Sequence, residues 1–220
     1  MNNTWRDRDR DFQKHLPGGE TTGSQLHDVL SKTETELRPI PGFDENVDDR
    51  NYYRLQHDID CDEVYPNIIL GDASTAKNKK FLKRLGVTHV LNTAEGNRFG
   101  LVNTNRHYYS DTSIEYLGLP IIDLPTIDIS QYFPAAVSFI HNALSSGGKV
   151  FVHCMLGISR SATCVIAYLM TKKEMLAVDA IQLVRTNRCI NPNQGFLRQL
   201  ANLDNRLRRE RLNKALQSTL

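Results

Sequence analysis

The stretch Lys149-Val-Phe-Val-His-Cys-Met-Leu-Gly-Ile-Ser-Arg-Ser-Ala162 decides the fold, because it joins a predicted strand to a predicted helix across a short loop. Residues 149–153 predict a buried strand, since an apolar, β-favouring run follows two glycines. Residues 162–170 predict a buried helix with little polar surface. A loop between a strand and a helix N-terminus favours an anion, because unpaired backbone N–H groups and the positive end of the helix dipole face it.

Two residues of this loop predict phosphate chemistry. Cys154 opens the loop, and Arg160 follows six positions later. A planar guanidinium can hold two oxygens of a phosphate dianion that the loop N–H groups surround. The same field lowers the pKa of a thiol from about 8.5, where roughly 3% is thiolate at about pH 7, to roughly 3.5–7.5. We therefore predict a thiolate that attacks phosphorus and forms a phosphocysteine intermediate. A buried structural cysteine near an unrelated arginine is the alternative for the loop alone.

The loop His153-Cys154-x-x-Gly157-x-Ser159-Arg160-Ser161 resembles the signature loop of the cysteine-dependent phosphatases in its dual-specificity form. Further blocks resemble the small, atypical VHR-like members and occur in the family order. These blocks are DEVYPNIILG at 62–71, GVTHVLN at 86–92, YLGLP at 116–120, DISQYF at 128–133 and NPNQGF at 191–196. The resemblance covers about residues 58–212 and implies a protein phosphatase that acts on phosphotyrosine and on phosphoserine or phosphothreonine.

The resemblance also implies roles for the loop residues. Cys154 is the expected nucleophile, Arg160 the phosphate-binding group, and Ser161 the hydroxyl that helps the thiolate leave in the second step. An ordinary serine in the first turn of a helix is the alternative for Ser161. The remaining loop residues are expected to bind substrate: His153, Met155, Leu156, Gly157, Ile158 and Ser159. His153 is further expected to hydrogen-bond within the loop and tune the thiolate; a plain residue at the strand end is its alternative.

A leaving alkoxide or phenolate needs a proton from a carboxylic acid near the site. Alignment of the 116–120 block with the family places this general acid at Asp123, 31 residues before Cys154. Asp128 competes for the role, but its position just before the next predicted helix fits an N-cap, which we prefer. The same Asp123 could then activate the water that hydrolyses the intermediate.

Arg188 is expected near the rim of the site, where members of the family often keep a basic group that accepts a second phosphate. A solvated surface arginine is the alternative. The chemistry requires no metal or other cofactor, and none of the seven histidines has a metal-ligand spacing. The apolar Met155, Leu156 and Ile158 add no loop charge for an inositol polyphosphate.

Composition bounds the partners. The 220 residues carry a net charge of +2, but residues 1–60 hold 8 Lys/Arg against 13 Asp/Glu, which leaves 19 against 12 for residues 61–220. A basic catalytic part suits phosphorylated proteins, with MAP kinases expected only by family analogy. No basic cluster is interleaved with aromatics, which argues against nucleic acid as a partner. No membrane span or signal peptide is apparent.

A thiolate enzyme needs a reducing compartment, the cytosol or nucleus. The sequence leaves the oligomeric state open.

Alternating strands and helices predict an α/β fold with a mostly parallel twisted sheet flanked by helices, as in the phosphatase family. Further strands are expected at 68–70, 88–91 and 115–117, and further helices at 25–31, 76–85, 130–144, 176–185 and 195–211. We predict a polar N-terminal extension at 1–57, a catalytic domain at 58–212 and a basic, frayed tail at 213–220.

Overall fold

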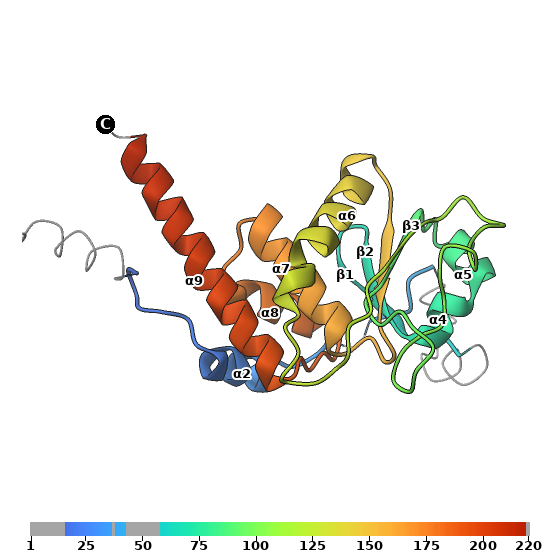
Figure 1. Cartoon of the computed structure of the whole chain (residues 1–220), viewed down its shortest axis with the longest axis horizontal. Coiled ribbons are helices and arrows are strands. Elements are labelled where there is room, and N and C mark those ends of the chain that lie inside the picture. The colour runs from blue at the N-terminus through green and yellow to red at the C-terminus, as the bar shows by residue number, and fades with distance from the viewer. Residues whose placement is uncertain (1–15, 37, 43–57, 219–220) are drawn as a thin grey trace, which may run out of the picture.

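A computed structural model describes residues 16–36, 38–42 and 58–218 of the chain. A five-stranded sheet with the order β1-β2-β5-β3-β4 lies at its centre (Figure 1). The strands are β1 (Cys61–Tyr65), β2 (Ile68–Gly71), β3 (His89–Asn92), β4 (Glu115–Gly118) and β5 (Val150–His153). Only the β1–β2 pair is antiparallel; the pairs formed by β2, β5, β3 and β4 are parallel. The α/β fold with a mostly parallel sheet is therefore confirmed.

Helices cover both faces of the sheet. The helices are α2 (Gly23–Lys32), α4 (Ala73–Lys77), α5 (Lys79–Arg84), α6 (Phe133–Ser145), α7 (Arg160–Lys172), α8 (Ala177–Asn187) and α9 (Gln194–Gln217). Figure 1 shows α4 and α5 on one side of the sheet and α6 to α9 on the other. No helix of the described ranges is both long and apolar enough to cross a lipid bilayer.

The alternation of side chains along the strands builds two cores. Val150 and Val152 of β5 belong to one core cluster with residues of α6, α7 and α9, whereas Phe151 between them belongs to another with Phe81 and Leu82 of α5. Successive residues of a strand point to opposite faces, so a strand buried on both faces is apolar throughout. All four residues of β5 are buried, and the strand lies between β2 and β3. The loop after β5 thus starts from the middle of the sheet, at a carboxyl edge, where such sheets bind ligands.

The predicted helix near residue 25 forms as α2. Thr22 and Gln25 make a reciprocal capping box at its N-terminus. Leu26 and Leu30 are buried in the core that α9 shares. Just before the helix, the Thr21 hydroxyl donates to Asp204 of α9 at 2.6 Å. This part of the predicted extension is therefore packed against the helical layer, whereas the predictions for 1–15 and 43–57 lie outside the described residues.

Three local predictions needed correction, and one strand was missed. Strand β1 was not predicted, because its Asp62 and Glu63 interrupt the apolar pattern. The helix expected at 76–85 is two short helices, since the Asn78 side chain caps a new start by accepting from Phe81 N at 3.0 Å. The helix expected at 130–144 begins with a 3-10 turn before Phe133. The last helix, expected at 195–211, is longer than predicted, because α9 continues to Gln217.

Candidate active site

The loop after β5 runs from Cys154 to Ser159 and leads directly into α7. Gly157 has a φ of +68°, a left-handed conformation that glycine adopts without strain. A Cβ at this position would lie 2.4 Å from the Gly71 carbonyl oxygen of β2. The loop is therefore wrapped tightly over the sheet edge, and a side chain at residue 157 would force it away.

Cys154 is the first residue of this loop and is only 2% exposed. The Ser161 hydroxyl donates to its sulfur at 3.5 Å. Burial by itself raises the pKa of the Cys154 thiol, but Arg160, the Ser161 hydroxyl and the backbone N–H groups of Ser161 and Ile158 outweigh it and lower the pKa below its usual value. This environment favours the thiolate, as the sequence predicts.

Arg160 is held by backbone carbonyls on two neighbouring loops. Its Nη1 donates to Gly100 O at 2.9 Å and to Ile121 O at 3.0 Å. Its Nε is buried, has no hydrogen-bond acceptor within the described part of the chain, and lies 3.5 Å from Asp123 Oδ2. A buried guanidinium whose Nε makes no hydrogen bond to the described residues is positioned to donate to an oxyanion.

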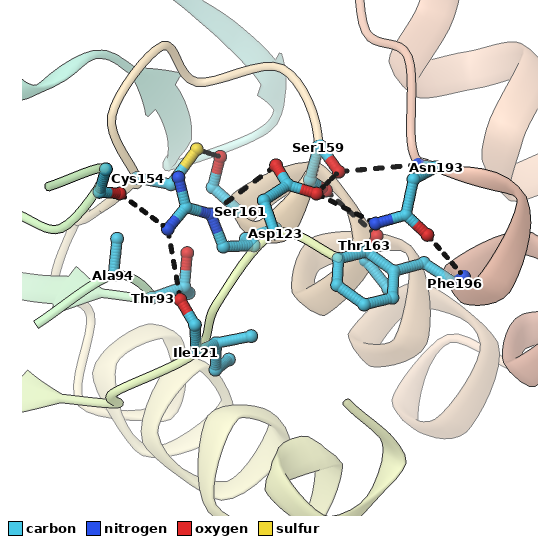
Figure 2. Close-up of polar contacts among 12 residues, drawn as sticks. Thr93, Ala94, Ile121, Asp123, Cys154, Ser159, Ser161, Thr163, Asn193 and Phe196 are labelled. Carbon is cyan, nitrogen blue, oxygen red and sulfur yellow. Dashed lines mark hydrogen bonds and ion pairs between the residues drawn. The ribbon is translucent and has the colours of Figure 1, made fainter. Parts of the chain in front are cut away.

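Asp123 lies on the loop after β4 and faces the Cys154 loop (Figure 2). Its Oδ1 accepts from the Ser159 hydroxyl at 2.8 Å and from Asn193 Nδ2 at 2.8 Å. The side chain is 32% exposed, so solvent still reaches the carboxylate. Asn193 was not among the predicted site residues, although it lies in the NPNQGF block that carries the resemblance.

The competing acid, Asp128, is engaged elsewhere. Its Oδ1 accepts from the backbone N–H of Ser130 at 3.0 Å and from the Ser130 hydroxyl at 2.6 Å. These bonds lie at the start of the 3-10 turn that leads into α6. Asp128 therefore forms a local turn with Ser130, although the N-cap position of the 3-10 turn is Ile129 and not Asp128.

His153 is fully buried at the end of β5. Its Nδ1 lies 3.1 Å from the Cys154 carbonyl oxygen, which can only accept, so Nδ1 carries the proton. Burial lowers the pKa of His153 to about 4, although this hydrogen bond opposes the shift. The ring is thus neutral at pH 7 and fixes the backbone of the nucleophile, while its Nε2 has no partner in the described residues.

Arg188 lies in a different place from the one expected. The residue is 3% exposed, and its guanidinium binds Asp60, Asp62 and the carbonyls of Leu156 and Gly157. Burial tends to lower the pKa of Arg188, but the two carboxylates raise it above its usual value, so the group is charged. Arg188 was predicted at a substrate-facing rim or, alternatively, on the solvated surface. Both positions are wrong, because the side chain is buried against these carboxylates and loop carbonyls.

Exposed apolar side chains border the loop. Of the seven large apolar side chains that are exposed within the described ranges, four lie on the loops that contain Gly100, Asp123 and Cys154. The four residues are Phe99, Ile122, Leu124 and Leu156. Two loops that carry them supply the Gly100 and Ile121 carbonyls to Arg160, and the third is the Cys154 loop itself. We therefore expect the entrance to the site to be partly apolar.

The family model described as "Dual specificity phosphatase, catalytic domain" matches residues 68–206, which include the Cys154 loop, Asp123 and Asn193. The chain belongs to this family. As a dual-specificity phosphatase catalytic domain, it is a hydrolase of phosphorylated proteins, and the recognition from sequence is confirmed. The same match includes Arg188 and omits β1 and α2.

Solved structures of two atypical dual-specificity phosphatases and of a phosphatase-like protein resemble this phosphatase. Human DUSP28 is 28% identical, with a TM-score of 0.58 over 67% of this chain and 94% of its own. DUSP15 is 30% identical, with a TM-score of 0.58 over 70% of this chain and 95% of its own. A human tyrosine phosphatase-like serine/threonine/tyrosine-interacting protein is 36% identical, with a TM-score of 0.54 over 65% and 94%.

Proposed function

We propose that this phosphatase hydrolyses phosphotyrosine, phosphoserine and phosphothreonine in proteins through a phosphocysteine on Cys154. The observation that carries the proposal is the set of donors around one buried sulfur: the Ser161 hydroxyl, two backbone N–H groups and the field of Arg160. Such a thiolate is a nucleophile at neutral pH. Arg160 binds the phosphoryl oxygens and stabilises the charge that they carry in the transition state.

The first step transfers the phosphoryl group to sulfur. The Cys154 thiolate forms an S–P bond while the P–O bond to the substrate side chain breaks, and Asp123 donates a proton to the leaving oxygen. The Ser159 and Asn193 hydrogen bonds to Oδ1 support this role, because they hold the carboxyl group of Asp123 against the Cys154 loop, with Oδ2 3.5 Å from Arg160 Nε.

The second step releases inorganic phosphate. Asp123, now ionised, takes a proton from a water that attacks phosphorus, and the S–P bond breaks. Ser161 donates to the departing thiolate, which the 3.5 Å contact in the free protein supports. No step of this mechanism requires a metal.

The substrate that we propose is a protein segment, not an inositol polyphosphate. The apolar side chains at the entrance favour contact with neighbouring residues of a polypeptide, and they provide no additional positive charge for further phosphates. Phosphorylated signalling proteins of the MAP-kinase type are the first substrates to test, in the cytosol or the nucleus, where a free thiol persists.

Rapid mixing with an aryl phosphate tests the mechanism. We expect a burst of phenolate that equals the enzyme concentration, followed by slower steady turnover, and we expect Cys154→Ser to abolish both phases. The Ser variant should still retain phosphopeptide, because Arg160 and the loop N–H groups are intact. Turnover without a burst would indicate either fast hydrolysis of the intermediate or another mechanism; trapping of a ³²P-labelled protein by acid quench separates these two.

The second candidate is a scaffold that binds phosphoproteins and turns them over poorly. The name of the interacting protein that resembles this chain favours testing it. If the protein is a scaffold, the wild-type protein and Cys154→Ser should bind phosphopeptide with equal affinity. Neither form should release phosphate.

A further inference from the structure

The guanidinium of Arg188 has no free donor for a substrate. An arginine side chain has five N–H groups. The Nε donates to Gly157 O at 2.9 Å, Nη1 to Asp60 Oδ1 at 3.0 Å and Asp62 Oδ2 at 2.8 Å, and Nη2 to Asp60 Oδ2 at 3.1 Å and Leu156 O at 3.1 Å. Five donors therefore meet five acceptors, and a second phosphate would have to displace one of them.

The carbonyls that Arg188 binds belong to the anion-binding loop. A loop that presents its N–H groups to an anion must turn its carbonyl oxygens away, because a carbonyl dipole in the pocket would repel the anion. Donors from outside the loop hold the carbonyls of residues 155–158: Ala73 N binds Met155 O, Asn191 N binds Ile158 O, and Arg188 binds the two between them. Among these donors to the loop carbonyls, Arg188 is the one side chain, and the other two are backbone N–H groups.

The position of Gly157 supports the same arrangement. A Cβ on this residue would lie 2.8 Å from Arg188 Nη2, so the guanidinium is packed against the backbone of the loop. The backbone N–H that follows, from Ile158, is one of the groups that lower the pKa of Cys154. Rotation of the Gly157–Ile158 peptide would therefore move a donor away from the sulfur at the same time as it freed the carbonyl.

The two carboxylates fix Arg188 on its far side. Asp62 of β1 is 3% exposed, and the Asp60 side chain is 33% exposed. Buried carboxylates and a buried guanidinium stay together because either one alone is poorly solvated. Strand β1 is thereby connected through Arg188 to the loop after β5, although β2 separates the two strands.

We propose that Arg188 is a positioning residue: with Asp60 and Asp62 as its anchors, it holds the Leu156 and Gly157 carbonyls away from the pocket so that the loop N–H groups face Cys154 and the substrate phosphate. It does not bind a second phosphate of the substrate. This inference rests on the proposed function, since it assigns Arg188 to the same catalytic loop.

Arg188→Lys tests the proposal, because lysine keeps the charge but lacks the planar fork that binds both carbonyls and both carboxylates. Three quantities are measured on wild type and variant: the pH midpoint of Cys154 alkylation by iodoacetamide, competitive inhibition by inorganic phosphate, and kcat/KM for matched singly and doubly phosphorylated peptides. Arg206→Lys is the matched control, since Arg206 is an exposed arginine of α9 whose Nε lies 3.9 Å from Glu210.

We expect Arg188→Lys to raise the alkylation midpoint and to weaken phosphate inhibition at least about tenfold, which corresponds to roughly 1.4 kcal/mol. Both peptides should lose kcat/KM by the same factor. The proposal is overturned if kcat/KM falls only for the doubly phosphorylated peptide while the pH midpoint of Cys154 alkylation is unchanged. That pattern identifies a second phosphate contact. It is also overturned if the folded variant melts earlier but keeps the wild-type midpoint and inhibition.

If Arg188→Lys does not fold, the double variant Arg188→Gln, Asp62→Asn carries the same test. This variant removes one positive and one negative charge together. The carboxylate of Asp60, which is partly exposed, can then be solvated by water. The same rise in the midpoint is expected, and an unchanged midpoint contradicts the proposal. A wild-type enzyme with an ordinary thiol and no burst would instead overturn the proposed function itself, so the two failures are distinguishable.

Discussion

Asn193 Nδ2 donates to Asp123 Oδ1 at 2.8 Å, so the residue that caps α9 also holds the candidate general acid. The same Asn193 side chain accepts from Phe196 N at 3.0 Å as the N-cap of that helix. One amide therefore connects the start of the longest helix with the loop after β4, and Figure 2 shows it beside Asp123. The position of the proposed proton donor depends on this contact.

Asn193→Ser separates the two roles of this amide. Serine is an equally good N-cap, so the stability of α9 should change by less than about 1 kcal/mol. The shorter side chain loses the bond to Asp123, and we expect kcat for phosphoserine peptides to fall about tenfold or more, since general acids contribute about 10²–10⁴. Activity on an aryl phosphate with an activated leaving group should change little. Equal losses on both substrates would show that Asn193 acts on something other than proton transfer.

Asp123→Asn removes the acidic proton that the leaving oxygen of the substrate would accept. Serine and threonine leave as alkoxides that are far more basic than the phenolate of tyrosine, whose conjugate acid has a pKa of about 10. We expect phosphoserine and phosphothreonine peptides to slow by about 10²–10⁴, and activated aryl phosphates to slow much less. The measurement is a pH–rate comparison of the three substrate classes, with Asp128→Asn as the control. If Asp128→Asn gives the selective loss and Asp123→Asn does not, the acid has been assigned to the wrong carboxylate.

His153→Gln should change the pH dependence of stability. The pKa of His153 falls from an ordinary 6.5 to about 4 in the folded protein, chiefly through burial. Between these values the unfolded chain binds a proton that the folded one excludes, so the free energy of unfolding decreases as pH falls from 6.5 to 4, by up to about 3 kcal/mol from this group.

Urea unfolding from pH 7 to pH 4 measures this effect. His153→Gln should show a shallower loss of stability than wild type, whatever its stability at pH 7. The exposed His27→Gln is the control and should keep the wild-type slope. Parallel curves for wild type and His153→Gln would mean that His153 does not exclude the proton.

Phe99→Ser tests the apolar entrance. The Phe99 side chain is fully exposed, and the next residue in sequence, Gly100, supplies a carbonyl that holds Arg160. We expect kcat/KM to fall about threefold to tenfold for a phosphopeptide with apolar flanking residues and to stay constant for a small aryl phosphate. Leu212→Ser, on the exposed side of α9, should change neither. A loss on the aryl phosphate as well would indicate that Phe99 supports the loop instead of the substrate.

The sequence predicted those parts of the molecule that local pattern determines. The apolar run of β5, its glycine-containing loop and the buried face of α7 are contiguous, so one stretch specified the strand, the loop and the helix. Strand β1 was missed because Asp62 interrupts its apolar pattern, and this buried carboxylate accepts a hydrogen bond from Arg188, 126 residues away. The break at Asn78 depends on a side-chain cap within an otherwise helical pattern.

The predicted site residues differ in the same way. Cys154, Arg160 and Ser161 lie close together in sequence, at the start of the loop after β5 and in the first turn of α7. Asp123 reaches them through its hydrogen bond with Ser159, which is 36 residues away in sequence. Arg188 was placed from family resemblance alone, which says nothing of the acceptors that surround it here. Where an arginine points depends on buried partners such as Asp62, and these are visible only once the chain is folded.

Titration of the Cys154 thiol tests the central claim most directly. The rate of iodoacetamide labelling is followed against pH, with the Cys154 peptide quantified by mass spectrometry, because exposed Cys189 also reacts. Burial raises the pKa of Cys164 to about 12, which leaves that cysteine as an internal unreactive reference. We predict a Cys154 midpoint well below about 8.5, shifted upward by Ser161→Ala. A midpoint at or above that value would contradict the account.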